Sequence, residues 1–333
     1  MKAHRCEVCG HPLFVGNTRC ESCGTRLGYL RAERRIVPVD EDGRWAGPAG
    51  LDRFVCQNLD TSGCTWLAPY RGAQCSCCDL TRTRPNDADA VGLAGFGRAE
   101  AAKRQLVAEL DTLGLPVAAR AEDPQRGLAF DLLSSAAEPV VTGHADGVIT
   151  LDLAESDDAR REQRRLELGE PYRTTLGHLR HEVGHYYQWL LLTESADLER
   201  ARELFGDETA DYQAAIDRHY ADGPPAHWHE RYVSAYATMH PFEDFAETWA
   251  HVLHITDALE TAREFGLLTG PAPGLTFRDL VTGSWVPLSI ALNQMNRSLG
   301  HGDPYPFGLA PAVLDKLDFV ADLVRRTGDR PES

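Results

Sequence analysis

The sequence predicts an α+β fold, in which a mainly helical region with a small sheet follows two small modules that are each held together by a bound metal ion. Three observations predict it. All nine cysteines lie between Cys6 and Cys78. Two short apolar runs with strand character follow, at 127–133 and 147–153. Amphipathic helical patterns then occupy most of the remaining chain.

The composition is that of a folded protein without a membrane span. Hydrophobic residues make up 43% of the 333 residues, and no run approaches the roughly 18 apolar residues that a membrane helix needs. The start, MKAHRCEVCG, lacks the apolar core and cleavage site of a signal peptide. The expected location is the cytoplasm.

The net charge of -16 is concentrated in the later part of the chain. Residues 1–90 carry 12 Lys and Arg against 11 Asp and Glu, whereas residues 91–333 carry 22 against 39. An acidic surface repels phosphate groups and anionic lipids. Nucleic acid and membranes are therefore not expected as partners.

Two C-x-x-C-G turns open the chain. Such a turn lets two thiolates converge on one metal, and its glycine accepts the backbone bend. Two turns together complete a tetrahedral four-thiolate zinc site, and cytosolic thiols at this spacing are typical of metal ligands rather than disulfides. The predicted ligands of the first structural zinc are Cys6, Cys9, Cys20 and Cys23.

A second cysteine group follows at wider spacing. Its predicted zinc ligands are Cys56, Cys64, Cys75 and Cys78. Cys77 is left over; it could replace a neighbour, but Cys75 and Cys78 have the usual C-x-x-C spacing. Modules this small bury little apolar surface, so bound zinc supplies much of their folding free energy. A structural role is the preferred interpretation.

These patterns give the predicted domain organisation. It consists of a first zinc ribbon at 1–30, a connector at 31–50, a second ribbon at 51–86, a linking helix at 87–118 and a catalytic domain at 119–333. In the linking helix Leu106, Leu110 and Leu113 share one stripe, and Gly114 ends it.

Four further helices are expected in the catalytic domain. Thr174 or Thr175 offers an N-cap for a helix that runs to about Leu192. Polar helices are expected at 195–205 and 207–220, and a helix at 241–256 has proline in its first turn.

The motif H-E-x-x-H lies in the first of these helices, as His181, Glu182 and His185. Positions i and i+4 share a helix face, so both histidines can bind one ion. Glu182 then lies beside the open coordination position, where it can accept a proton from water.

A catalytic zinc needs a third protein ligand. The downstream candidates are His240, Glu243, Asp244, Glu247, His251 and His254. Glu243 and Glu247 are four residues apart, which suits one as ligand and the other as a partner that orients a histidine ligand; alternatively, they form a solvated face. The residues after His185 lack the third histidine of a metzincin, so a glutamate-type zincin fits best.

Several segments carry a family resemblance. They are the two ribbons, LGHLRHEVGHYY, FGDETADYQAAIDRHYADGPPA, YVSAYATMHPFEDFAETWAHVLHI and YPFGLAPAVLDKL. Over nearly its whole length the sequence resembles the bacterial zinc-binding metallopeptidases that join an N-terminal zinc-ribbon region to a zincin domain. The resemblance implies a zincin-like metallopeptidase domain, mainly helical with a small sheet, preceded by two zinc-ribbon modules.

A narrower resemblance covers the two motif helices. The pattern Y-x6-E-x-F-A-E is similar to that of the zincins typified by anthrax lethal factor and the proline-specific clostridial endopeptidases. It implies Glu243 as third ligand, Tyr236 as the phenol that stabilises the oxyanion, and Glu247 as a residue that contacts and orients a histidine ligand without binding the metal. Tyr232 is the competing phenol, and His240 could contribute to substrate binding.

The expected function is zinc-dependent hydrolysis of a cytoplasmic peptide or protein, with one catalytic and two structural zinc ions. Glu182 is expected to take the proton of the zinc-bound water and deliver it to the leaving amine. The strand at 147–153 is expected to be the edge that pairs with an extended substrate. The alternatives are an adaptor with an inert zincin domain, which binds nucleic acid or protein, and a regulatory peptidase that cuts one partner and docks it through the ribbons.

Overall fold

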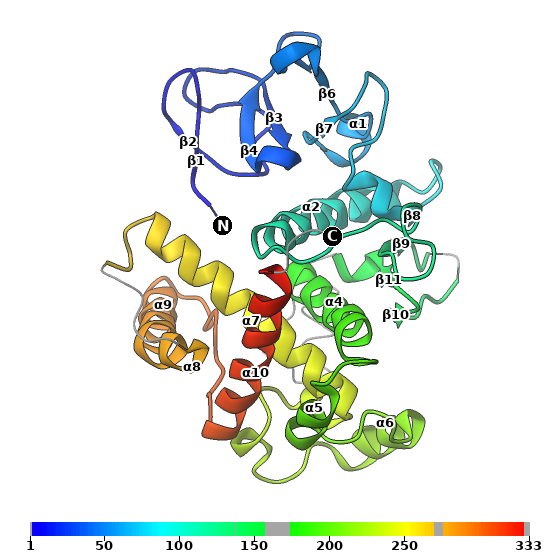
Figure 1. The fold of residues 1–333 in the computed structure, drawn as a ribbon, viewed down its shortest axis with the longest axis vertical. Coiled ribbons are helices and arrows are strands. Elements are labelled where there is room, and N and C mark those ends of the chain that lie inside the picture. The colour runs from blue at the N-terminus through cyan, green and yellow to red at the C-terminus, as the bar shows by residue number, and fades with distance from the viewer. Residues whose placement is uncertain (1, 137, 157–173, 270–275, 330–333) are drawn as a thin grey trace. The chain divides into compact units, whose positions relative to one another are not determined.

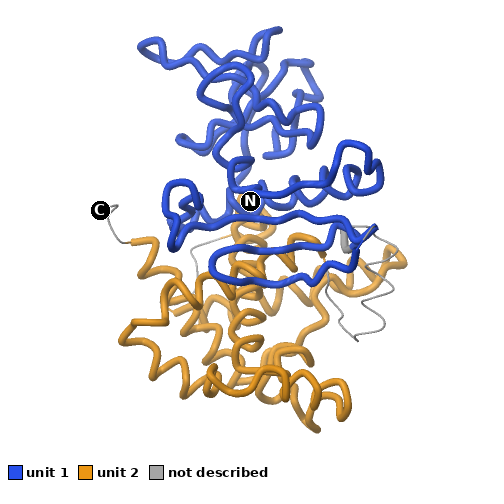
Figure 2. The backbone as a smooth tube through the Cα atoms, turned by 90° about the vertical axis from the view of Figure 1, so that its right-hand side faces the viewer, with its two compact units in different colours: residues 1–158 blue, residues 159–333 orange. Residues whose placement is uncertain are grey.

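The computed structural model describes residues 2–136, 138–156, 174–269 and 276–329. The chain divides into two compact units, residues 1–158 and residues 159–333 (Figure 2). Long helices dominate and the sheets are small, which confirms the predicted α+β class. The division at residue 158 differs from the domain start predicted at residue 119; the predicted domain limits stay a prediction.

The cysteine-rich part of the first unit is built from very short strands. They are β1 (His4–Arg5), β2 (Pro12–Leu13), β3 (Leu27–Leu30), β4 (Arg35–Pro38), β5 (Arg44–Trp45), β6 (Arg53–Val55) and β7 (Leu67–Ala68), with the short helix α1 (Leu59–Ser62) before β7. Strands β1 and β2 form one hairpin, β3 and β4 another, and β5, β6 and β7 a three-stranded sheet.

The segment predicted as a connector, 31–50, takes part in these sheets. It contains β4, which pairs with β3, and β5, which pairs with β6. Leu30, Val37, Val39 and Leu67 form one small core. Residues on both sides of the segment thus share a core, so the segment is more than a tether.

A long helix and a four-stranded sheet complete the first unit. Helix α2 (Ala90–Thr112) begins at Asp89, whose side chain accepts a hydrogen bond from the Gly92 amide, and it buries Leu106 and Leu110 as predicted. The sheet contains β8 (Thr81–Thr83), β9 (Ala129–Leu133), β10 (Gly143–Ala145) and β11 (Val148–Asp152), in the order β10-β11-β9-β8.

Both predicted strands of this sheet are confirmed, as β9 and β11, but the expected edge is wrong. Strand β11 pairs with β10 on one side, antiparallel, and with β9 on the other, parallel. Its backbone hydrogen-bonding groups therefore face neighbouring strands on both sides, and an added peptide strand has no free ladder there.

The second unit is helical. Its helices are α4 (Thr175–Leu192), α5 (Leu198–Phe205), α6 (Tyr212–Asp222), α7 (Pro241–Glu264), α8 (Phe277–Leu280), α9 (Val286–Ser298) and α10 (Pro311–Gly328) (Figure 1). A π-helical turn at 281–285 leads into α9. No helix in the described ranges is long and apolar enough to cross a membrane.

Side-chain caps set where these helices begin. Thr174 caps α4 as predicted, because its side chain accepts from the Gly177 amide at 2.9 Å. Helix α6 begins later than expected because Asp211 caps it. Helix α7 has the predicted proline in its first turn and His240 as N-cap, but it continues to Glu264, beyond the predicted end at 256.

Helices α4 and α7 cross closely at a glycine. A Cβ atom on Gly184 would lie 2.9 Å from the Cα atom of Ala246. Beside this point the rings of Tyr187 and Trp249 stack with centroids 4.8 Å apart, and both rings are buried. Only a residue without a side chain lets the two backbones approach this far.

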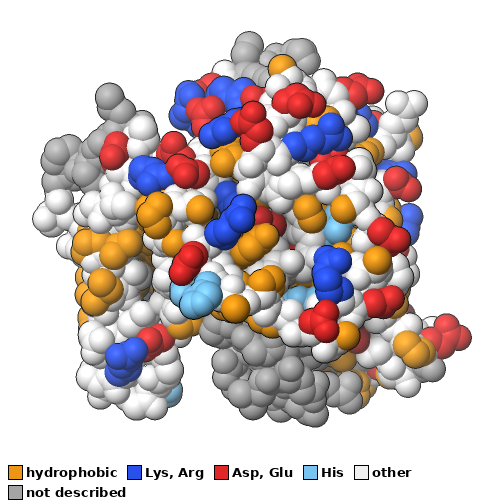
Figure 3. All heavy atoms as spheres, turned by 90° about the horizontal axis from the view of Figure 1, so that it is seen from below, with side chains coloured by type: hydrophobic (Ala, Val, Ile, Leu, Met, Phe, Trp, Pro, Cys, Tyr) orange, Lys and Arg blue, Asp and Glu red, His pale blue; other side chains and the backbone are white. Residues whose placement is uncertain are grey.

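The surface of the second unit mixes charges of both signs. On the face drawn in Figure 3, lysine and arginine side chains lie among aspartates and glutamates. The second unit also contains ion pairs, as between Arg202 and Glu208 at 2.7 Å and between Arg326 and Asp197 at 3.0 Å. The acidic excess is therefore not gathered into one field on this face.

Replacing Gly184 tests the helix crossing. We expect Gly184→Ala to lower the free energy of unfolding by about 1–3 kcal/mol, because the added methyl group meets backbone. Gly97 of α2 gives the matched control, since no described atom lies within 4 Å of a Cβ built there; Gly97→Ala should stabilise by about 0.5–1 kcal/mol through helix propensity. Urea denaturation measures both, and a Gly184→Ala chain as stable as the wild type would contradict the close crossing.

Candidate metal centres

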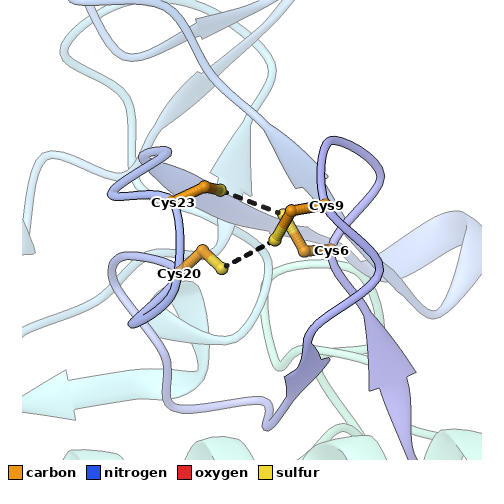
Figure 4. A group of neighbouring side chains, drawn as sticks. All are labelled: Cys6, Cys9, Cys20 and Cys23. Atoms are coloured by element: carbon orange, nitrogen blue, oxygen red, sulfur yellow. Dashed lines mark hydrogen bonds between the residues drawn. The ribbon is translucent and has the colours of Figure 1, made fainter.

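The four cysteines of the first group face one another across two turns (Figure 4). The Cys6 and Cys23 sulfur atoms are 3.7 Å apart, and those of Cys9 and Cys20 are 3.6 Å apart. Zinc–sulfur bonds of about 2.3 Å in a tetrahedron place sulfur atoms about 3.8 Å from one another. The geometry therefore fits a zinc ion, and all four thiols are free.

Glycine shapes both turns, as the C-x-x-C-G pattern predicts. Gly10 and Gly24 have φ values of 75° and 72°, in the left-handed region. Their amides donate to the carbonyl groups of Cys6 and Cys20. Hydrogen bonds from Thr25 lower the pKa of the Cys23 thiol to about 6, which favours the thiolate that binds metal.

The second group is buried throughout. Sulfur atoms of Cys56 and Cys78 lie 3.6 Å apart, and those of Cys64 and Cys75 lie 3.7 Å apart, which again fits zinc. Cys77 lies outside the group, and burial raises the pKa of its thiol to about 12. The spacing argument and the geometry thus select the same four cysteines.

Charged side chains of α2 lie behind this second group. Glu100 Oε2 is 3.9 Å from the Cys78 sulfur, and Glu100 Oε1 accepts from Lys103 at 2.6 Å. Both side chains are almost fully buried, and Arg104 lies 3.8 Å from the same carboxylate. The two cations can offset the carboxylate and part of the net negative charge that four thiolates around one zinc ion carry.

The third group joins helices α4 and α7. His181 Nε2 and His185 Nε2 are 3.1 Å apart. Glu243 Oε2 lies 3.0 Å from the first nitrogen and 3.4 Å from the second. All three side chains are buried. The i, i+4 spacing aligns the histidines, and the helix crossing brings Glu243 to them.

The donor atoms of this third group fit zinc. Glu243 Oε2 is buried and accepts no hydrogen bond from any described residue, although two imidazoles surround it. Zinc bonds of about 2.0–2.1 Å in a tetrahedron place ligand atoms about 3.3 Å apart, close to the three distances seen. Two imidazoles and a carboxylate also leave a fourth position open.

Glu182 presents two different oxygen atoms. Its Oε1 lies 3.1 Å from His178 Nε2, one helical turn earlier on α4. Its Oε2 is buried without a hydrogen-bond partner among the described residues. Burial alone would raise the pKa of Glu182, but the contact with His178 and the neighbouring imidazoles hold that pKa below its usual value.

Glu247 contacts both a histidine of the third group and the segment before α7. Its Oε1 lies 2.7 Å from His181 Nδ1, and its Oε2 accepts from the Ser234 hydroxyl at 2.6 Å. The same hydroxyl accepts from the Ala237 amide at 3.1 Å. A hydrogen-bonded chain therefore links His181 to the turn that carries Tyr236.

The other candidate ligands make contacts elsewhere. His240 caps α7, Asp244 accepts from Lys316, and His251 Nδ1 lies 2.8 Å from the Tyr305 hydroxyl. His254 stacks on Tyr305. None of the four belongs to a metal-type cluster within the described ranges.

Two tyrosines, Tyr236 and Tyr212, contact residues of the third group, and Tyr232 does not. The Tyr236 ring lies 5.9 Å from the His181 ring, and burial followed by the charge of Glu243 raises the pKa of Tyr236 well above its usual value. Tyr232 instead faces Lys316, whose Nζ lies 4.4 Å from its ring centroid. The Tyr212 hydroxyl donates to Glu243 Oε1 at 2.8 Å.

The charges of the ligands depend on one another. Burial alone would lower the pKa of His181, but the carboxylates of Glu243 and Glu247 raise it well above its usual value. Burial alone would raise the pKa of Glu243, but His185 and His181 hold it well below its usual range. The lowered pKa of Glu243 favours its carboxylate form, which is the form that binds a metal.

Sequence reasoning missed three residues around this site. His178 was visible as a histidine one turn before Glu182, and Ser234 lies within the segment that carried the family resemblance. Tyr212 also lies within such a segment, FGDETADYQAAIDRHYADGPPA, but 31 residues separate it from Glu243, so spacing did not connect the two. An exposed fourth group, His227, His229 and Glu230, also brings metal-type atoms together and was not anticipated.

Two family models match the chain. A family model described as "Putative zinc-binding metallo-peptidase" matches residues 93–323, and a zinc-ribbon domain model matches residues 3–89. The first match covers more than half of the chain, so the protein belongs to this zinc-binding metallopeptidase family, as the resemblance implied.

Similar proteins are found in mycobacteria. Proteins of Mycobacterium tuberculosis and Mycobacterium bovis, each named as uncharacterized, are 50% identical, over 97% of this chain and 95% of their own length. No solved structure matches the chain.

Neighbouring cysteines of the second group provide a matched test. We expect Cys78→Ser to lose one equivalent of zinc, because three thiolates bind far more weakly than four. Cys77→Ala should retain it, since Cys77 lies outside the cluster. Zinc per chain, measured by atomic emission, separates the two. Equal loss in both variants would mean that Cys77 is a ligand.

Proposed function

We propose that this protein is a zinc-dependent peptidase of the glutamate type, which hydrolyses peptide bonds of a protein or peptide. One observation carries the proposal. Three buried donor atoms converge within 3.4 Å of one another, beside a buried carboxylate that has one oxygen without a partner. A purely structural metal site would have four protein ligands and no such carboxylate beside it.

His181, His185 and Glu243 would hold the catalytic zinc. Zinc bound there supplies a Lewis acid that polarises a carbonyl group and makes water acidic enough to lose a proton near neutral pH. Two further zinc ions in the cysteine groups bring the proposed content to three per chain. Their role is structural, because four thiolates leave no open position.

Glu182 acts as the general base and then the general acid. Its contact with His178 fixes one carboxylate oxygen, which leaves Oε2 to accept a proton from water. The water oxygen attacks the peptide carbonyl carbon, Glu182 passes the proton to the amide nitrogen, and the carbon–nitrogen bond breaks. The proton leaves with the new amine, so Glu182 is regenerated.

Tyr236 is the phenol that donates a hydrogen bond to the oxyanion of the substrate. Its ring lies near His181, and Ser234 and Glu247 hold the turn on which it sits. The competing Tyr232 faces Lys316 instead. The contacts of the two side chains favour Tyr236.

The substrate is proposed to be cytoplasmic. All nine cysteines are free thiols, which suits a reducing compartment. Nucleic acid is not a proposed partner, because the chain carries a net charge of -16. In the alternative, the protein is an adaptor and the third group has no catalytic activity. A buried carboxylate such as Glu182 beside the group would then have no evident function.

Removing the general base tests the proposal. We expect Glu182→Gln to retain three zinc ions while turnover falls by about 10²- to 10⁴-fold, since the amide cannot accept the proton. The measurement compares new protein N-termini in cells that carry the wild-type chain or the variant, together with zinc per chain.

Two outcomes would contradict a peptidase. One is an identical set of N-termini with both chains. The other is a wild-type chain with two zinc ions in which His181→Ala and His185→Ala have no effect. Many unrelated cleavage sites would indicate a general peptidase, and a single cleaved protein would indicate a regulatory one.

The two phenols can be separated by paired substitutions. We expect Tyr236→Phe to lower kcat by about 10²- to 10³-fold with little change in KM, because an oxyanion donor acts in the transition state. Tyr232→Phe should leave kcat within about twofold, since its hydroxyl serves no reacting group. Kinetics on a cleaved peptide distinguish them, and the reverse pattern would assign the role to Tyr232.

A further inference from the structure

Helix α6 is a peripheral element with little packing of its own. It lies at the margin of the second unit, next to α5 (Figure 1). Among its 11 residues only Ala215 is buried. A helix of this length is marginal by itself in water, so a few specific contacts must hold it in place.

Those contacts concentrate at its N-terminal end, against the start of α7. The Tyr212 hydroxyl donates to Glu243 Oε1 at 2.8 Å. His240 Nε2 lies 3.0 Å from the Ala210 carbonyl oxygen, and the His240 and Tyr212 rings meet edge to face at 5.2 Å. At the other end, the His219 ring approaches Tyr236 with centroids 6.2 Å apart.

The two oxygen atoms of the Glu243 carboxylate have different partners. Oε2 faces the two histidine nitrogens at 3.0 and 3.4 Å. Oε1 is the oxygen that Tyr212 holds. A carboxylate fixed through one oxygen presents the other to a metal in one orientation, which reduces the ordering that binding requires.

We propose that Tyr212 is a positioning residue of the metal centre. Its hydroxyl fixes Oε1, the oxygen of Glu243 that does not face the histidines, and so links α6 to the bound metal. The inference rests on the metal centre of the proposed function, but not on peptide hydrolysis. Tyr212 differs from Tyr236 in this respect, since Tyr236 serves the substrate and Tyr212 serves a ligand.

A reciprocal effect follows from linkage. If docking of Tyr212 raises the affinity for metal by some factor, bound metal must favour the docked position of α6 by the same factor. Metal should therefore slow hydrogen exchange of the α6 amides in the wild-type chain. Without the hydroxyl, this dependence on metal should disappear.

The test compares two tyrosines of the same helix in the full chain. Tyr212→Phe keeps the ring and removes the hydroxyl that bonds Glu243. Tyr220→Phe makes the same change at a position that is 66% exposed, where the hydroxyl does not bond Glu243. Zinc affinity is measured by competition with a chelator, and His181→Ala gives the signal of the cysteine sites alone.

We expect Tyr212→Phe to weaken zinc binding at the third group by about 10- to 100-fold, the range for groups that orient a ligand. Tyr220→Phe should match the wild type within twofold. Hydrogen exchange with and without zinc should show protection of α6 in the wild type and in Tyr220→Phe, but not in Tyr212→Phe.

Three outcomes overturn the inference: unchanged zinc affinity in Tyr212→Phe, an equal loss in Tyr220→Phe, or protection of α6 by zinc that survives in Tyr212→Phe. The proposed function fails separately. A chain with Tyr212-dependent zinc binding that cuts no peptide keeps the inference and loses the peptidase. If the protein cuts peptides but Tyr212→Phe binds zinc as tightly as the wild type, the proposed function stands and the inference about Tyr212 is wrong.

Discussion

The close crossing of α4 and α7 at Gly184 is the constraint on which the third metal-type group depends. Gly184 directly precedes His185 on one helix, and Ala246, which it meets, directly precedes Glu247 on the other. With a side chain between them, the backbones would stand apart and the carboxylates would fall short of the imidazoles. The stacked rings of Tyr187 and Trp249 fix the crossing and exclude water. Buried ionisable groups are tolerated here because each faces a group of opposite charge.

Around this crossing, polar contacts add to the apolar packing of the neighbouring elements. The chain from His181 through Glu247 and Ser234 reaches the turn before α7, and Lys316 of α10 bonds both Asp244 and the carbonyl oxygen of Arg231. A metal centre needs ligands whose orientation is set before the ion arrives. The same contacts that satisfy buried polar groups therefore also prepare the site.

Local patterns predicted the elements whose geometry is local. Helices α4 and α7 have capping residues at their starts, and the cysteine turns have fixed spacing. The strands within the predicted connector, β4 and β5, were not predicted, because strands of two to four residues show almost no periodicity in the sequence. Strands β9 and β11 were both recognised, but their pairing with each other and with β8 and β10 was not, because alternation of residues identifies a strand and not what pairs with it.

The sequence by itself determined that His181 and His185 share a face with Glu182 beside them, since a helix fixes the direction of residues four apart. It also limited the candidates for the third ligand to a short downstream segment, in which the family resemblance implied Glu243. Only the tertiary structure placed the Glu243 carboxylate beside the two histidines, and only it brought Tyr212 to Glu243 across 31 residues. Contacts between helices depend on where the helices cross, and that position is set by packing of the whole unit rather than by local spacing.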